Sequence, residues 1–249
     1  MNETIKNQLS HRTIREFSSK VVPEEVISTL LSVANRTASS NGMQQFSIIR
    51  ITDAAIKRRI AAVCEQEYVG RVPELFIFVA DCYRNSRIAY EQGYESKDTC
   101  DMDRFFQAFT DACLAVQNMT ASIESLGLGA VYFGSILNDL QEIIDILALP
   151  EFTFPVLGIG FGYPAQNPQL KPRMDISLKV FENQYRVFDN YSENISGYDK
   201  EMQTYYDLRD NGKHSDSFSV QVVKKLRAVR EKRVLLLSIA KKQGFDLKL

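Results

Sequence analysis

Two short cationic segments are the residues of this sequence whose types and spacing could do chemistry. Residues 11–17 read HRTIREF, and residues 171–173 read KPR. A dianionic phosphate needs several converging cations. Lys171 and Arg173 are two positions apart, so on an extended strand they project to one side, and Pro172 favours that extended form. The two segments could therefore hold one phosphate between them, although each alone could also be an exposed charged turn.

Chemistry by side chains alone has little further support. The four cysteines show no CxxC spacing, and with only two histidines a zinc site would lack ligands at any usual spacing. The sequence has no phosphate-binding P-loop, and the glycines of residues 127–134 and 158–162 do not fit the dinucleotide-binding fingerprint. We expect no metal site, and we interpret the cysteines as reduced thiols that lie mostly in the core.

Length and charge exclude several classes of protein. The chain has 249 residues, of which 45% are hydrophobic and 24% charged, as is usual for a globular protein. Thirty basic residues face thirty-one acidic ones, so no global attraction to nucleic acid or to an anionic membrane is expected. No apolar stretch is long enough to span a bilayer and the N-terminus has no apolar signal region, which predicts a cytoplasmic protein.

The apolar pattern predicts alternating helices and strands that must position the cationic segments. Helices are predicted from Pro23 onward and over residues 53–65. Asn138 and Gln141 resemble a capping box for a helix that ends at Pro150. Strands are predicted at residues 46–51, 75–80, 131–133 and 155–162, and residues 176–188 could hold one more.

A long buried helix is predicted over residues 104–126. Its apolar residues recur at steps of three and four, from Phe105 to Ile123. Asp101 or Asp103 would cap its start, and Gly127 would end it.

The tail leaves a non-enzymatic alternative open. Residues 195–240 are polar and helical in character, with many lysines and arginines on an amphipathic pattern. A binding protein could use the basic residues between 224 and 242 to contact nucleic acid. That run is balanced by acidity elsewhere and lacks interleaved aromatic residues, so we favour no nucleic-acid partner.

Four segments together resemble a known family. They are residues 11–17, the turn of residues 38–41 leading through Gln44 to residues 47–53, residues 124–132 (ESLGLGAVY), and residues 170–173. In this order and at this spacing, the chain resembles the nitroreductase superfamily, specifically the NADPH-dependent nitroreductases and flavin reductases that use FMN.

The resemblance implies an α+β fold, in which a central mixed sheet is flanked by helices. It also implies an intertwined homodimer with two FMN sites at the subunit interface. Residues 1–249 would form one FMN-binding domain, whose C-terminal extension from about residue 176 contributes to the dimer and to a nucleotide-binding loop.

Phosphate and backbone contacts are implied by position. Arg15 would approach the pyrimidine edge of the flavin, where a cation tunes the ring because reduced flavin develops negative charge there. Gly129 and Ala130 would pass close to the cofactor. Relatives often have a second glycine where this chain has Ala130, which disfavours a left-handed backbone at that position. The implied phosphate contacts are His11, Arg12, Thr13, Lys171 and Arg173.

Two further groups of contacts are implied. Arg209 and Lys213, in a polar loop, would contact the phosphates of NADPH. Residues 84–103 do not align with the family and could form a lid with its own acceptor preference. The implied contacts to the ribityl chain and ring are Ser39, Ser40, Asn41, Gln66 and Tyr68.

The implied reaction is a ping-pong transfer of two electrons. NADPH would reduce FMN by hydride transfer and leave, and a nitroaromatic, quinone or flavin acceptor would then occupy the same place. Within the family, a dedicated free-flavin reductase or a dehalogenase-like member would share the FMN contacts and differ in the lid.

Overall fold

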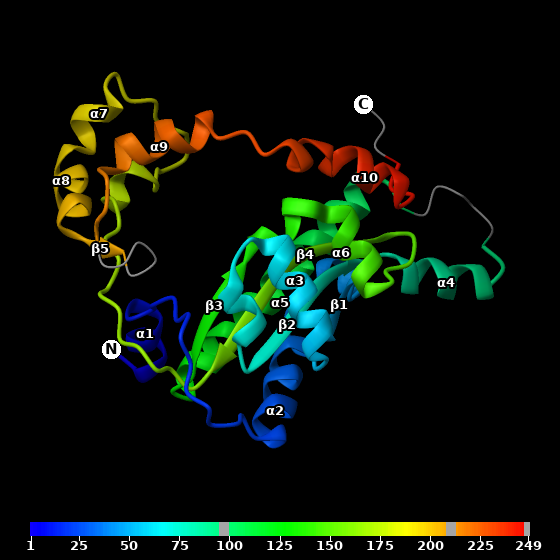
Figure 1. Ribbon diagram of the computed structural model, residues 1–249. Coiled ribbons are helices and arrows are strands. Elements are labelled where there is room, and N and C mark those ends of the chain that lie inside the picture. Colours follow the sequence, from blue (N-terminus) through cyan, green and yellow to red (C-terminus); the bar gives the residue numbers. More distant parts are fainter. Residues whose placement is uncertain (95–99, 208–212, 247–249) are drawn as a thin grey trace. The chain divides into compact units, whose positions relative to one another are not determined.

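The computed structural model folds into two compact units, and it describes residues 1–94, 100–207 and 213–246 (Figure 1). The first unit comprises residues 1–167 and 230–249, and the second comprises residues 168–229. The chain therefore leaves the first unit once and returns to it.

A four-stranded sheet forms the centre of the first unit. Its order is β1-β2-β4-β3, and all three pairings are antiparallel. The sheet itself is therefore antiparallel rather than mixed, and parallel pairing is described only as isolated bridges, one of which joins Thr13 to Ala130. The strands are β1 (Phe46–Arg50), β2 (Glu74–Asp81), β3 (Gly129–Phe133) and β4 (Thr153–Gly162).

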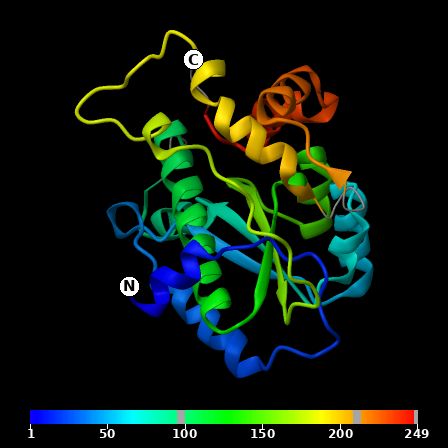
Figure 2. The same cartoon turned by 90° about the vertical axis from the view of Figure 1, so that its left-hand side faces the viewer.

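Helices cover both faces of this sheet, as Figure 2 shows with α5 in green on one side and α3 in cyan on the other. The central strand β2 explains why. Phe76, Phe78 and Ala80 pack into the core beneath α5 (Met102–Ser125), while alternate residues pack into a second core on the opposite face. Because side chains of a strand alternate between faces, a continuous apolar run is buried on both.

The second core lies beneath helices α3 (Ala54–Cys64) and α6 (Leu140–Leu147) and the 3₁₀ turns η2 (Glu67–Arg71) and η3 (Gly134–Asp139). On the α5 side, α2 (Glu24–Asn35) packs against α5. The remaining helical elements of this unit are α1 (Glu3–Leu9), η1 (Ser40–Gly42), α4 (Tyr83–Glu91), η6 (Glu231–Leu235) and α10 (Leu236–Lys242).

The predicted long helix is confirmed. Asp101 caps α5 by accepting a hydrogen bond from the Arg104 amide at 2.9 Å. Gly127, with φ of +73°, follows its end. Buried residues repeat along the face that meets the sheet, including Phe105, which packs edge-on against Phe245 with ring centroids 4.9 Å apart.

Two local predictions are wrong. Asp139, rather than Asn138, caps α6 through the Glu142 amide, because residues 134–139 form a 3₁₀ turn that moves the helix start. That helix also ends before Pro150, at Leu147, where Ala148 adopts a left-handed backbone with φ of +48°.

The second unit contains helices and one two-stranded sheet. The predicted strand over residues 176–188 is absent from this part of the described chain, where the 3₁₀ turn η4 (Ile176–Leu178) stands instead. The apolar residues there, such as Ile176 and Val187, are exposed, so no sheet face holds them. The other elements are α7 (Tyr191–Asn194), α8 (Ser196–Thr204), β5 (Tyr206–Asp207), β6 (Lys213–His214) and α9 (Phe218–Arg227).

Candidate functional site

The N-terminal cationic segment lies along the free edge of β3. Thr13 forms a parallel bridge with Ala130, and the Ile14 amide donates to the Ala130 carbonyl at 2.9 Å. Further along, Phe17 bridges Pro164 at the end of β4. The sheet edge therefore fixes residues 13–17 beside β3, which begins at Gly129, and beside the end of β4.

Gly129 makes this close approach possible. A Cβ atom at Gly129 would lie 2.5 Å from Cγ1 of Ile14, well inside van der Waals contact. Ala130 is a regular residue of β3. Its carbonyl accepts the Ile14 amide, and its φ is not positive. The structure thus gives the small residue at position 129 a packing role toward Ile14.

Two arginines of this segment carry buried donors that no described residue satisfies. The Nε atoms of Arg12 and Arg15 are buried and have no hydrogen-bond partner among the described residues. Leaving a buried donor unpaired costs about 1–3 kcal/mol, and more for a charged group. An anionic or carbonyl-bearing ligand would satisfy both donors, so the residues present fit a phosphate and the polar edge of a flavin ring.

His11 is held from the other side by α5. Its Nδ1 lies 2.5 Å from Oε1 of Glu124, and the Glu124 side chain is only 14% exposed. A small pocket of about 200 Å³ adjoins His11, Arg12, Glu124 and Gly129. This pair orients the imidazole. Glu124 lies in the motif of residues 124–132, but the sequence did not predict its contact with His11, which lies 113 positions away in the chain.

The predicted ring contacts Gln66 and Tyr68 lie near this segment. Oε1 of Gln66 accepts two hydrogen bonds, from the Tyr68 hydroxyl at 3.0 Å and from the Ser135 hydroxyl at 3.3 Å. An ion pair of 3.2 Å between Arg71 and Glu16 ties the same 3₁₀ turn to the N-terminal segment. The structure therefore brings η2 and residues 11–17 together.

Ser39, Ser40 and Asn41 lie in a separate turn that rests on α5. Both oxygens of Asp111 accept backbone amides from this turn, at 2.8 Å from Ser40 and 3.1 Å from Gln45. The turn is strained, since Asn41 is one of its two non-glycine residues with a left-handed backbone, which cost of order 1–3 kcal/mol each. Sequence reasoning missed Asp111, although an acidic residue on the buried face of a long helix was a usable signal.

Within one chain, the serine turn and the His11 end of the site attach to α5 at different positions along the helix. Asp111 holds the turn of residues 39–45, and Glu124 holds His11, thirteen residues further along the helix. At a rise of 1.5 Å per residue, the two attachment points are roughly 20 Å apart. One chain therefore does not bring the serine turn to the His11 end of the site.

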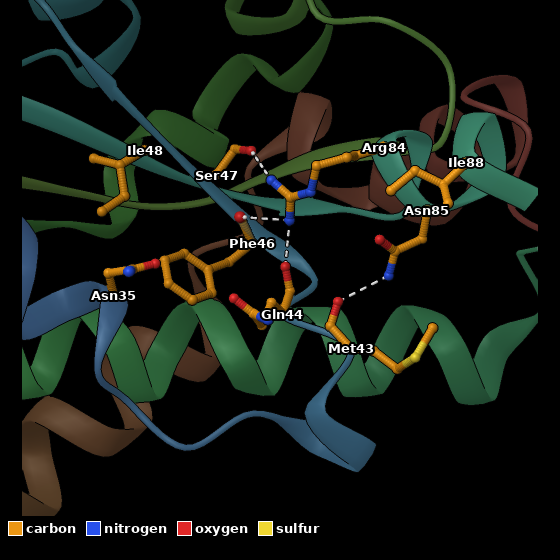
Figure 3. Close-up of a pocket in the computed structure, with 9 residues that line it drawn as sticks. All are labelled: Asn35, Met43, Gln44, Phe46, Ser47, Ile48, Arg84, Asn85 and Ile88. Carbon is orange, nitrogen blue, oxygen red and sulfur yellow. Dashed lines mark hydrogen bonds between the residues drawn. The ribbon is translucent and has the colours of Figure 1, made fainter.

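A larger pocket of about 510 Å³ lies on the far side of the serine turn, between β1 and α4. Figure 3 shows Arg84 of α4 reaching the backbone of this region, where its guanidinium donates to the carbonyls of Gln44 and Phe46. Asn85 donates to the Met43 carbonyl at 2.9 Å. The pocket wall is thus built largely from contacts that hold the turn.

The remaining predicted residues lie in the second unit or outside the described residues. Lys171 and Arg173 are exposed, and Arg173 donates to the carbonyls of Lys171 and Pro172 at 2.9 and 3.1 Å. Their convergence with residues 11–15 stays a prediction. Arg209 lies outside the described residues, and Lys213 forms the start of β6.

Neither a metal site nor a membrane span is found in the residues that the structure describes. No group of three histidine, cysteine, aspartate or glutamate side chains there could hold a metal ion. No helix there is long and apolar enough to cross a membrane. The four cysteines, three of them buried, form no disulfide in the described residues, and burial raises the pKa of the Cys64 thiol to about 11.

Comparison with known proteins identifies the family. The sequence model of the nitroreductase family matches residues 9–163, and that of the nitroreductase family's C-terminal domain matches residues 171–248. The chain belongs to the nitroreductase family. The boundary between the two nitroreductase matches falls close to residue 168, where the second compact unit begins.

Three relatives within the nitroreductase family cover almost the whole chain. An FMN reductase (NADPH) of Bacillus subtilis is 34% identical over 249 residues, which are 99% of each protein. An oxygen-insensitive NADPH nitroreductase of Salmonella typhimurium is 32% identical and covers 98% of this chain and 99% of its own. The solved structure of the NfrA1 nitroreductase from B. subtilis has a TM-score of 0.90 at 33% identity, covering 98% of this chain and 99% of that one.

Proposed function

We propose that this chain is an FMN-dependent oxidoreductase that passes two electrons from NADPH to nitroaromatic, quinone or flavin acceptors. Family membership and the names of the relatives, an NADPH-dependent FMN reductase and an NADPH nitroreductase, support an oxidoreductase of this kind. The observation in this chain that carries the proposal is the pair of buried, unpaired Nε donors on Arg12 and Arg15.

FMN offers partners for both arginines. Its phosphate would be held by Arg12 with His11 and Thr13 and, in the second unit, Lys171 and Arg173. Charge-assisted hydrogen bonds of this kind are about twice as strong as neutral ones. Since Glu124 holds the imidazole of the histidine, the segment is organised before the phosphate arrives.

Arg15 would serve the ring rather than the phosphate. When bound, FMN supplies the redox chemistry, accepting two electrons from NADPH and giving them to the acceptor. Arg15 lies three residues beyond Arg12 on a segment fixed by the Ile14–Ala130 hydrogen bond, so it would reach a different part of the ligand. Its cation would stabilise the negative charge that the reduced ring carries at its pyrimidine edge.

A second subunit would complete the site. The serine turn and the His11 end of the site attach to α5 roughly 20 Å apart, so in a homodimer the turn of one subunit would line the flavin held by the other. The α1 and α5 surface supports an interface, because it leaves large apolar side chains exposed. They are Ile5, Leu9, Phe106 and Leu114.

Steady-state kinetics with NADPH and three acceptors, a nitroaromatic, a quinone and free FMN, test the proposal. Because the donor leaves before the acceptor binds, double-reciprocal plots should be parallel. We also expect NADPH to be preferred over NADH, with a preference that shrinks as salt screens the 2′-phosphate contact and shrinks again in Arg209→Ala. Intersecting lines would contradict the ping-pong order, turnover with free FMN alone would indicate a dedicated flavin reductase, and no turnover would refute the proposal.

A further inference from the structure

A single buried carboxylate holds both ends of the serine turn. Oδ1 of Asp111 accepts from the Ser40 amide at 2.8 Å, and Oδ2 accepts from the Gln45 amide at 3.1 Å. The Asp111 side chain is 1% exposed. In the described parts of the chain, no ion pair joins Asp111 to a cation. Its two oxygens instead accept hydrogen bonds from backbone amides that are five residues apart.

The turn needs such a support because its backbone is unfavourable. Asn41 and Gln44 adopt left-handed conformations, with φ of +50° and +52°. Inside the turn, the Gln44 amide donates to Oγ of Ser39 at 3.1 Å. Non-glycine residues keep such conformations only where surrounding contacts over-determine them.

Contacts from α4 fix the opposite side of the same turn. As Figure 3 shows, Asn85 points to the Met43 carbonyl, and Arg84 points to the backbone of Gln44 and Phe46. Amides on one side and carbonyls on the other are thus held by separate helices. The backbone is fixed, while the exposed side chain of Asn41 is left available.

We propose that Asp111 is a positioning residue for the flavin: by holding the amides of Ser40 and Gln45, it presents residues 39–41 to the cofactor. This inference rests on the proposed function. Asp111 contacts the turn and acts through it, because its carboxylate is buried beneath the backbone.

The test compares Asp111→Asn with the wild-type chain in FMN affinity and in amide hydrogen exchange. Asparagine keeps the size but replaces one acceptor with a donor that faces a backbone amide. We expect FMN to bind on the order of tenfold more weakly, since a misplaced turn loses oriented contacts, and residues 39–45 to exchange faster. Thr153→Val is the matched control, because Thr153 is 4% exposed and its hydroxyl donates to the Pro150 carbonyl and not to a residue of the turn.

Each outcome decides the inference. Unchanged FMN affinity or unchanged exchange of residues 39–45 in Asp111→Asn overturns it, as does an equal effect in Thr153→Val. If Asp111→Asn does not fold, Asp111→Glu, which keeps the carboxylate, replaces it in both measurements, and failure of both to fold would show a role in folding instead. Absence of FMN binding by the wild-type chain would refute the proposed function, whereas exchange of the turn would still report whether Asp111 holds it.

Discussion

Replacing Gly129 with alanine tests whether the N-terminal segment needs the edge of β3 to form the site. The new Cβ would lie 2.5, 2.7 and 2.9 Å from Cγ1, Cβ and Cγ2 of Ile14. The Cβ of Ile14 is fixed by its backbone, so a change of rotamer cannot relieve the contact. The segment must move away from the strand, and the 2.9 Å hydrogen bond from the Ile14 amide to Ala130 must lengthen.

The expected cost follows from these contacts. Forcing a methyl group into a packed site costs about 1–3 kcal/mol, and a lost hydrogen bond costs about 0.5–1.5 kcal/mol. If half of the combined cost of about 1.5–4.5 kcal/mol appears in binding, FMN affinity falls roughly 3- to 40-fold, since each 1.4 kcal/mol is about a factor of ten. Arg12 and Arg15 move with the segment, which is why binding rather than only stability should respond.

The assay is titration of FMN by fluorescence, with Gly134→Ala as the matched control. A Cβ at Gly134 would meet nothing within 4 Å, and its φ is not positive. Adding Ile14→Ala to the Gly129→Ala variant removes two of the three close contacts and should restore part of the affinity. Equal affinity in the two glycine variants would refute the reasoning, and a loss that Ile14→Ala leaves unchanged would indicate that position 129 touches the cofactor directly.

Three other variants test separate contacts. Lys171→Ala with Arg173→Ala should give a folded protein that purifies with little flavin, because two charge-assisted phosphate contacts are lost; an unchanged FMN affinity would contradict the assignment. Arg15→Ala should slow flavin reduction by NADPH more than it weakens FMN binding, since its contact strengthens as charge develops, and stopped-flow and titration data compare the two effects. Lys232 donates a hydrogen bond to Asp139 and lowers the pKa of that carboxyl. The contact stabilises the folded state at pH values above the unfolded-state pKa, and this stabilisation is lost as pH falls through the folded-state pKa. The small stability difference between Lys232→Ala and wild type in denaturant unfolding should therefore be present at pH 7, begin to shrink near the unfolded-state pKa of about 4, and vanish only below the lowered folded-state pKa. A difference that does not shrink in acid would contradict it.

Local patterns predicted the elements that meet the core. The run of residues 75–80 and the stripe from Phe105 to Ile123 are buried as their periodicities indicate. Patterns at element ends were less informative, because the start of α6 depends on a 3₁₀ turn packed in the second core. Residues 176–188 alternate like a strand, but a strand also needs a partner, which local sequence does not specify.

In the candidate site too, local sequence predicted some residues, and others depend on contacts between distant parts of the chain. The motifs located the N-terminal segment, the serine turn and Gly129. The residues that hold them, Asp111 and Glu124, act across 66 or more positions of the chain. Such contacts are set by how α5 packs on the sheet. The place of Asp111 on the buried face of a predicted helix was a usable signal, but the partners of Asp111 and Glu124 could be found only in the folded structure.

The visible spectrum of the purified chain tests the central claim most directly. Bound oxidised FMN absorbs blue light, and this band should bleach when NADPH is added without oxygen and return when a quinone follows. A chain that purifies without the band, gains none after incubation with FMN, and shows no bleaching with NADPH would contradict the account.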